Sequence, residues 1–190
     1  MKAIKAIQWA TLSMWFVVTI GTSFAQTEKP KITMHRQAAG ELDDSGWTTA
    51  TSTKGGYSVK LPSKFNDFTV LHENPKSLVD QAHVLSATML QRIRFTTTRV
   101  HFHNGLSTAR KQFENLKSPK GKSPYKNLKA MKLNNHEAIE GEIETKQGSL
   151  MQRTVLLDED LFTMIVEYSK TQETVVKRLA PLFFESVKFE

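Results

Sequence analysis

The sequence contains no cysteine, and this absence excludes several kinds of site. Disulfides, zinc sites built on thiolates, cysteine nucleophiles and lipid attachment to an N-terminal cysteine all require that residue. A chain of 190 residues is nevertheless long enough to bury a stabilising core without cross-links. A protein of this length can therefore fold in an oxidising compartment without forming disulfides.

Catalytic signatures are also lacking. The sequence has no G-x-S-x-G nucleophile elbow, no Walker loop and no G-x-G-x-x-G dinucleotide fingerprint. His136, Glu137 and Glu140 only partly match the H-E-x-x-H zinc motif, because the second histidine is missing and the alternation around them is that of a strand. The zinc motif needs one face of a helix. The sequence therefore favours a non-catalytic protein without a cofactor.

The N-terminus has the three parts of a secretory signal. Lys2 and Lys5 provide the positive start, residues 9–20 form the apolar core, and residues 23–25 end in a small-x-small cleavage site. The apolar core is shorter than the roughly 20 residues needed to cross a bilayer, although an uncleaved anchor is the alternative. We expect cleavage between Ala25 and Gln26, export to the periplasm and no transmembrane span in the mature protein.

The charge and length of the mature chain indicate one modestly basic domain. The signal carries two lysines and no acidic residue, so its removal lowers the formal net charge from +7 to +5. So small a surplus does not predict nucleic-acid binding. We expect a flexible leader over residues 26–47, which shows no helical or strand periodicity, and a single α+β domain over residues 48–190, with Trp47 packed at its edge.

Residues 136–168 predict an antiparallel meander of three strands, because apolar residues alternate in three runs separated by two polar turns. Their apolar face requires a cover, and a C-terminal helix is the expected one. That helix is expected to end or kink near Leu179, because Pro181 in a helix interior costs roughly 3 kcal/mol. Its apolar residues are Val175, Val176, Leu179, Leu182 and Phe183.

The remaining segments predict further strands and one more helix. Residues 57–61, 94–103 and 125–133 alternate as strands, and residues 107–117 place apolar side chains on one helical stripe. Residues 75–93 fit either a helix or a buried strand. The expected fold class is α+β, an antiparallel sheet of about six or seven strands flanked by two main helices.

Histidines and lysines supply the candidate binding residues. His101 and His103 project from the same side of a strand, so both could reach one metal ion with His72, His83 or His136 as a third ligand. Arg99 shares their side and opposes a cation. Eight basic residues with the single acid Glu114 form a patch that could contact an anionic partner, or could pair with a glutamate row. They are Arg110, Lys111, Lys117, Lys120, Lys122, Lys126, Lys129 and Lys132, and the glutamates are Glu140, Glu142 and Glu144.

Two terminal motifs resemble a known family. GGYSVKLPSKF near the start and APLFFESVKF at the end, with the helix LSTARKQFENL between them, are similar to the PsbP-like fold that periplasmic DcrB-like lipoproteins share. The resemblance covers roughly residues 55–190 and implies a central antiparallel sheet flanked by helices, with a strand at residues 84–90. It implies a binding or assembly role without catalytic residues. The lipidated cysteine of DcrB-like proteins is missing, which puts membrane anchoring in doubt.

The sequence therefore favours an exported, non-catalytic, monomeric accessory or binding protein of the bacterial cell envelope. Its expected partner is an envelope protein or an anionic lipid or polysaccharide surface, and not nucleic acid. The candidate contact residues are Lys117, Lys120, Lys122, Lys126 and Lys129. The alternative is a metal-binding protein or metal-dependent enzyme that uses His101 and His103.

Overall fold

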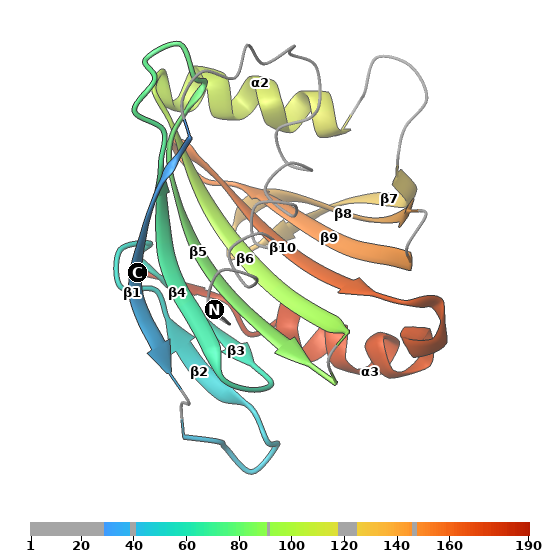
Figure 1. Ribbon diagram of the computed structural model, residues 1–190. Helices are drawn as coiled ribbons and strands as arrows, with labels where there is room; N and C mark the ends of the chain where they lie inside the picture. The colour runs from blue at the N-terminus through green and yellow to red at the C-terminus, as the bar shows by residue number, and fades with distance from the viewer. Residues whose placement is uncertain (1–28, 39–40, 91, 118–124, 146–147) are drawn as a thin grey trace.

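A large sheet of eight antiparallel strands, in the order β1-β4-β5-β6-β10-β9-β8-β7, dominates the fold (Figure 1). A smaller sheet has the order β11-β3-β2. The computed structural model describes residues 29–190 except 39–40, 91, 118–124 and 146–147. The strands are β1 (Lys31–Ala38), β2 (Thr48–Thr51), β3 (Tyr57–Leu61), β4 (Phe65–Leu71), β5 (Val79–Met89), β6 (Ile93–Phe102), β7 (Tyr125–Leu133), β8 (His136–Thr145), β9 (Gly148–Leu156), β10 (Asp160–Tyr168) and β11 (Lys188–Phe189); the helices are α2 (Gly105–Lys117), the 3-10 turn η1 (Lys170–Gln172) and α3 (Glu173–Phe184).

The α+β class and the two main helices are confirmed, but the expected number of strands is wrong. The described residues hold eight strands in the large sheet and three in the small one, instead of six or seven in all. One missed strand is β1, in the segment where the sequence showed no strand periodicity. Its register with β4 shifts between Met34 and Arg36, and such a bulge interrupts the alternation of side chains that marks a strand.

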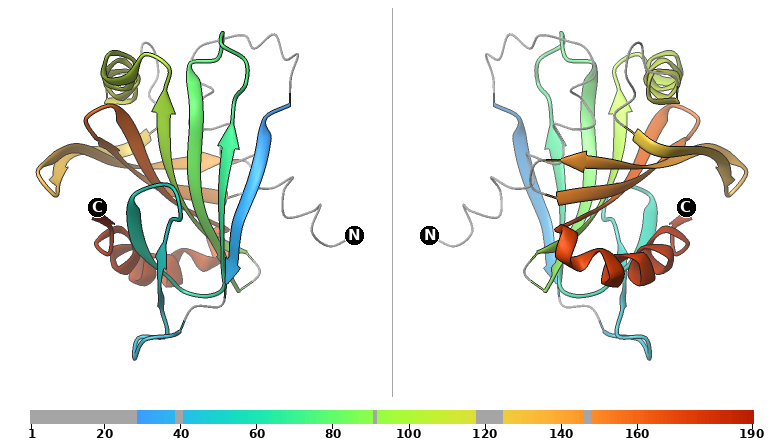
Figure 2. Two further views of the ribbon diagram at one scale, coloured as in Figure 1. Left: turned by 90° about the vertical axis from the view of Figure 1, so that its left-hand side faces the viewer. Right: turned by 90° about the vertical axis from the view of Figure 1, so that its right-hand side faces the viewer.

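Different elements pack on the two faces of the large sheet. On one face, which we call the α3 face, α3 and the small sheet enclose Trp47, Tyr57, Phe95, Phe162 and Phe183. On the opposite face, the α2 face, three residues of the helix pack on three of the strands. They are Ala109, Phe113 and Leu116 of α2 and Ile139, Leu156 and Leu161 of β8, β9 and β10. The two helices lie at opposite ends of the molecule (Figure 2).

The meander is confirmed, since β8, β9 and β10 are consecutive antiparallel neighbours. The expectation of one apolar face covered by the C-terminus is incomplete, because Ile139 lies under α2 while Phe162 lies under α3. Residues 79–89 form strand β5, which settles the ambiguity of that segment. Its neighbouring residues Val84 and Leu85 are both buried, because they point to opposite faces of the sheet and belong to different hydrophobic clusters. Apolar residues on both faces hide the alternation of a strand.

Helix α3 does not end near Leu179 but runs on through Pro181 to Phe184. Pro181 is exposed and has no backbone N–H to donate within the helix. Its carbonyl still accepts a hydrogen bond of 3.0 Å from the Glu185 backbone N–H. Phe183 and Phe184 are buried as expected, whereas Leu182 is 51% exposed and does not belong to the core. Among the described residues, no helix has the length and apolar character to cross a membrane.

Replacing Gly148 by alanine should lower the free energy of unfolding by about 2–3 kcal/mol. A Cβ atom at this position would overlap the backbone carbonyl oxygen of Tyr168, and neither of these adjacent strands can move without disturbing the sheet. Gly141→Ala is the matched control, because the atoms nearest its new Cβ belong to the Tyr125 and Leu128 side chains, which can shift. Urea unfolding should show a clearly larger loss for Gly148→Ala; equal losses would contradict this reading.

Candidate functional site

The basic residues singled out in the sequence lie on α2 and on β7, an edge strand of the large sheet. Three of them already have acidic partners, and the first is Arg110, whose Nη1 atom lies 3.2 Å from Glu137. The Nζ atom of Lys126 is 2.6 Å from a carboxylate oxygen of Glu144, and that of Lys117 is 3.8 Å from Glu137. Lys120 and Lys122 lie outside the described residues. The glutamate row therefore neutralises part of the patch, which was the alternative left open by the sequence.

Lys129 and Lys132 differ from their neighbours, because within the described part of the chain neither takes part in an ion pair. Glu140 is directly opposite Lys129 in the register of β7 and β8. Its carboxylate is taken by Arg153, whose Nε and Nη2 atoms lie 2.9 and 2.7 Å from Oε2. Both lysines are exposed. This strand consequently presents two positive charges to the surroundings.

An exposed lysine on an edge strand also has a structural explanation. Charged side chains and bulges stop a second sheet from pairing with an open edge. In β7 the register shifts between Lys126 and Lys129, and Asn127 within that shift has a φ of 54°. The lysines of β7 can therefore protect the edge as well as contact a partner, and an experiment on them has to separate the two roles.

His101 and His103 are not brought together. The Nδ1 atom of His101 lies 2.7 Å from Asp160, whose other carboxylate oxygen accepts a hydrogen bond of 2.7 Å from Arg99. His103 instead faces Asp80 at 3.9 Å. No group of three or more histidine, aspartate or glutamate residues in the described ranges is placed to hold a metal ion. The metal-binding alternative therefore gains no support from the geometry.

Asp160 is the partner that sequence reasoning missed. Burial acts to raise its pKa, but the hydrogen bonds from His101 and Arg99 outweigh burial and hold the pKa below its usual range. Asp160 follows the exposed acids Asp158 and Glu159, so the sequence alone groups it with them in a polar turn. Its burial could have been inferred only from its position at the start of an otherwise mostly apolar strand.

A chain of hydrogen bonds links the edge strand β1 to this buried cluster. The Thr69 hydroxyl is 2.7 Å from Nε2 of His35 and 2.9 Å from Nδ1 of His83, and the His83 ring meets the His101 ring edge-on with centroids 5.1 Å apart. Burial, then the neighbouring His101, His35 and Arg99, lower the pKa of His83 to about 4. His83 is therefore a neutral hydrogen-bonding group at neutral pH.

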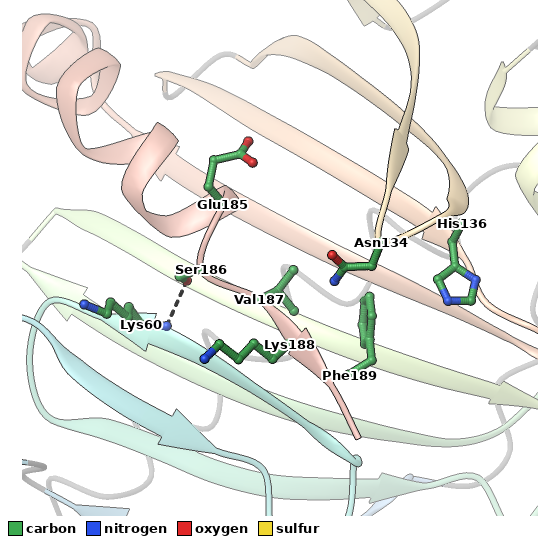
Figure 3. A pocket seen from close by; sticks show the side chains of 8 residues that line it. All are labelled: Lys60, Asn134, His136, Glu185, Ser186, Val187, Lys188 and Phe189. Carbon is green, nitrogen blue, oxygen red and sulfur yellow. Dashed lines mark hydrogen bonds between the residues drawn. The ribbon is translucent and has the colours of Figure 1, made fainter.

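A depression of about 620 Å³ lies where β3, the turn between β7 and β8, and the segment after α3 meet (Figure 3). Sequence reasoning did not identify it, because its walls come from three distant parts of the chain. The Ser186 hydroxyl donates to the Phe183 carbonyl oxygen at 2.7 Å and accepts from the Lys60 backbone N–H at 2.9 Å, which fixes one wall. The lining residues are Lys60, Asn134, His136, Glu185, Ser186, Val187, Lys188 and Phe189.

Comparisons with known proteins found similarity in structure. No protein-family model matches the sequence, and no curated protein matches it. Cyanobacterial PsbP (CyanoP) from Synechocystis is similar with a TM-score of 0.48 and 12% identity, over 80% of this chain and 98% of that chain. LpqN, involved in cell envelope biogenesis of Mycobacterium tuberculosis, is similar with a TM-score of 0.35 and 11% identity, over 86% of both chains. The resemblance to PsbP that the sequence motifs indicated is thus found in the structure too, and at these identities it is a likeness of fold alone.

Proposed function

We propose that this chain is an exported, non-catalytic accessory or binding protein of the bacterial cell envelope, which contacts an anionic partner through a basic surface. The partner is an acidic envelope protein or an anionic lipid or polysaccharide surface. The signal peptide expected at residues 1–25, outside the described residues, supports the periplasmic location. The basic surface comprises Lys117, Lys126, Lys129 and Lys132, with Lys120 and Lys122, which lie between Lys117 and Lys126 in the sequence, as further candidates.

One observation carries this proposal: Lys129 and Lys132 are exposed on an edge strand without an ion pair in the described ranges, while the glutamate opposite Lys129 is held by Arg153. A lysine beside a carboxylate offers little net charge to a partner, whereas an unpaired lysine near an anionic surface contributes about 1 kcal/mol of attraction. Lys129 and Lys132 are therefore the residues expected to matter most. Lys117 and Lys126 are expected to contribute less.

The double variant Lys129→Glu, Lys132→Glu should bind vesicles of phosphatidylglycerol and phosphatidylcholine at least about tenfold more weakly than the wild type, because two attractions become repulsions. Co-sedimentation at low and moderate salt measures this, and the difference should shrink with salt. A pull-down from a periplasmic extract with the same variant tests for an acidic protein partner.

Lys64→Glu, Lys76→Glu is the matched control, since it changes the net charge equally at exposed positions away from β7. Glutamate keeps both edge positions of β7 charged, so lost binding in the first variant would not come from strands pairing at an unprotected edge. Equal weakening in both double variants would show that only net charge matters. If the Lys129→Glu, Lys132→Glu variant binds vesicles and pull-down partners as the wild type does, the proposed binding surface is wrong.

A further inference from the structure

The depression beside the C-terminal segment has the volume of a small-molecule site, and its lining joins two apolar residues to six polar or charged ones. Its volume of about 620 Å³ lies within the range of roughly 300–1,000 Å³ typical of ligand pockets. Val187 is buried and Phe189 half-buried in this lining. The Phe189 ring is held in place by Phe162, at 5.0 Å between centroids, and by His136, at 5.9 Å. The apolar part is therefore fixed before any ligand arrives.

The charges around the depression leave one cation without a partner. Lys60 is paired with Asp43, and Glu185 accepts from Arg153 at 2.9 Å. Lys188, by contrast, is exposed and forms no ion pair in the part of the chain that the structure describes. The lining therefore matches a ligand with a single anionic group.

Figure 3 shows how these groups are distributed. The side chains of Lys60 and Lys188 extend toward the same end of the depression, and Asn134 and His136 stand at the other. Val187 and Phe189 lie between the two ends. An elongated molecule would therefore meet a cation first, an apolar stretch next and a hydrogen-bonding amide last.

We propose that this depression binds an anionic amphiphile, a molecule with one carboxylate or phosphate headgroup on a short alkyl or acyl chain. Lys188 pairs with the headgroup, and the chain lies on Val187 and Phe189. The Asn134 amide can hydrogen-bond a polar group at the far end. The site shares no residue with the basic surface of β7, so it stands or falls independently of the proposed function.

Dodecanoate and dodecyl phosphate, both below their micellar concentrations, are suitable probes, with uncharged dodecyl maltoside for comparison. Titration calorimetry should detect binding of at least one anion and weaker binding of the maltoside. Lys188→Glu should weaken binding of the anion about fivefold or more, as expected for a partly exposed charge pair turned repulsive. Lys177→Glu, the same charge change outside the lining, should leave the affinity within twofold. Whichever anion binds more tightly identifies the headgroup.

Amide chemical shifts provide the second measurement. With either anion they should change at Asn134 and at residues 186–189 of the wild type, and the changes should shrink in Lys188→Glu. Failure of both anions to bind, equal affinity in Lys188→Glu and the wild type, tight binding of the maltoside, or shift changes confined to other parts of the chain would each overturn the proposal. Vesicle binding lost through Lys129 and Lys132 would not affect it.

Discussion

Replacing Arg153 by alanine should lower the free energy of unfolding by about 3–5 kcal/mol, the largest effect that we expect from a single change. The side chain is only 6% exposed, and its guanidinium joins three elements. It donates to Glu140 on β8, to the Phe184 carbonyl oxygen at 3.1 Å and to Glu185 at 2.9 Å. It also lies 4.9 Å above the Phe184 ring. Its loss would leave a half-buried carboxylate and a helix-terminal carbonyl without their donors.

Chemical denaturation measures this effect, and Lys177→Ala is the matched control. Lys177 also pairs with a glutamate, Glu173, but the two side chains are 60% and 50% exposed, and an exposed pair contributes at most about 0.5 kcal/mol. Arg153→Met should recover part of the loss, because it restores apolar contact with Phe184 without a charge. A loss below about 1 kcal/mol for Arg153→Ala would mean that the end of α3 is held in place by packing alone.

The stability of the protein should fall by about 3 kcal/mol as the pH drops from about 6.5 to about 4, the second large effect. Burial lowers the pKa of His83 from 6.5 to about 4 in the folded protein. Between these two values the unfolded chain binds a proton at His83 and the folded chain does not. Protonation therefore favours unfolding, and this contribution to stability is fully present above pH 6.5 and lost toward pH 4.

Neighbouring charges strengthen this effect. His101, His35 and Arg99 act to lower the pKa of His83, and Asp160 acts to raise it. His83→Asn keeps a polar group near the Thr69 hydroxyl but cannot titrate, so thermal melting from pH 7 to pH 4 should show a flatter decline for this variant. Val84→Ala, a neighbouring cavity mutation, should lower stability at every pH with the wild-type slope. An unchanged slope in His83→Asn would assign the decline to other groups.

The elements predicted from the sequence are those whose apolar residues recur at a regular spacing along the chain. Residues 136–168 and 125–133 were predicted as strands in this way, although β10 is buried almost throughout and β7 has a register shift between Lys126 and Lys129. β1 was missed where a register shift interrupts the alternation, and the end of the last helix was placed too early because α3 continues through Pro181. Local patterns are visible in a sequence, whereas bulges and solvent exposure depend on the assembled sheet.

The candidate sites were less predictable for the same reason. The spacing of His101 and His103 predicted projection from one strand, but β6 ends at Phe102, so that His101 lies on it and His103 in the turn that follows. Their acidic partners Asp160 and Asp80 come from other strands. The unpaired state of Lys129 depends on Arg153, 24 positions later in the chain. The order of the strands in the sheet decides which charged side chains become partners. The spacing of residues in a single sequence does not give that order.

Strand β10 is shared between both sides of the large sheet, and this has a consequence for how the protein unfolds. Phe162, Met164 and Val166 belong to the α3 face, while Leu161 lies under α2. If the packing on one face of the sheet is lost, β10 loses its support, and the apolar residues on the other face become exposed as well. The two ends of the molecule should therefore lose their structure in one cooperative step, so that Trp47 fluorescence near α3 and a label introduced on α2 report the same midpoint.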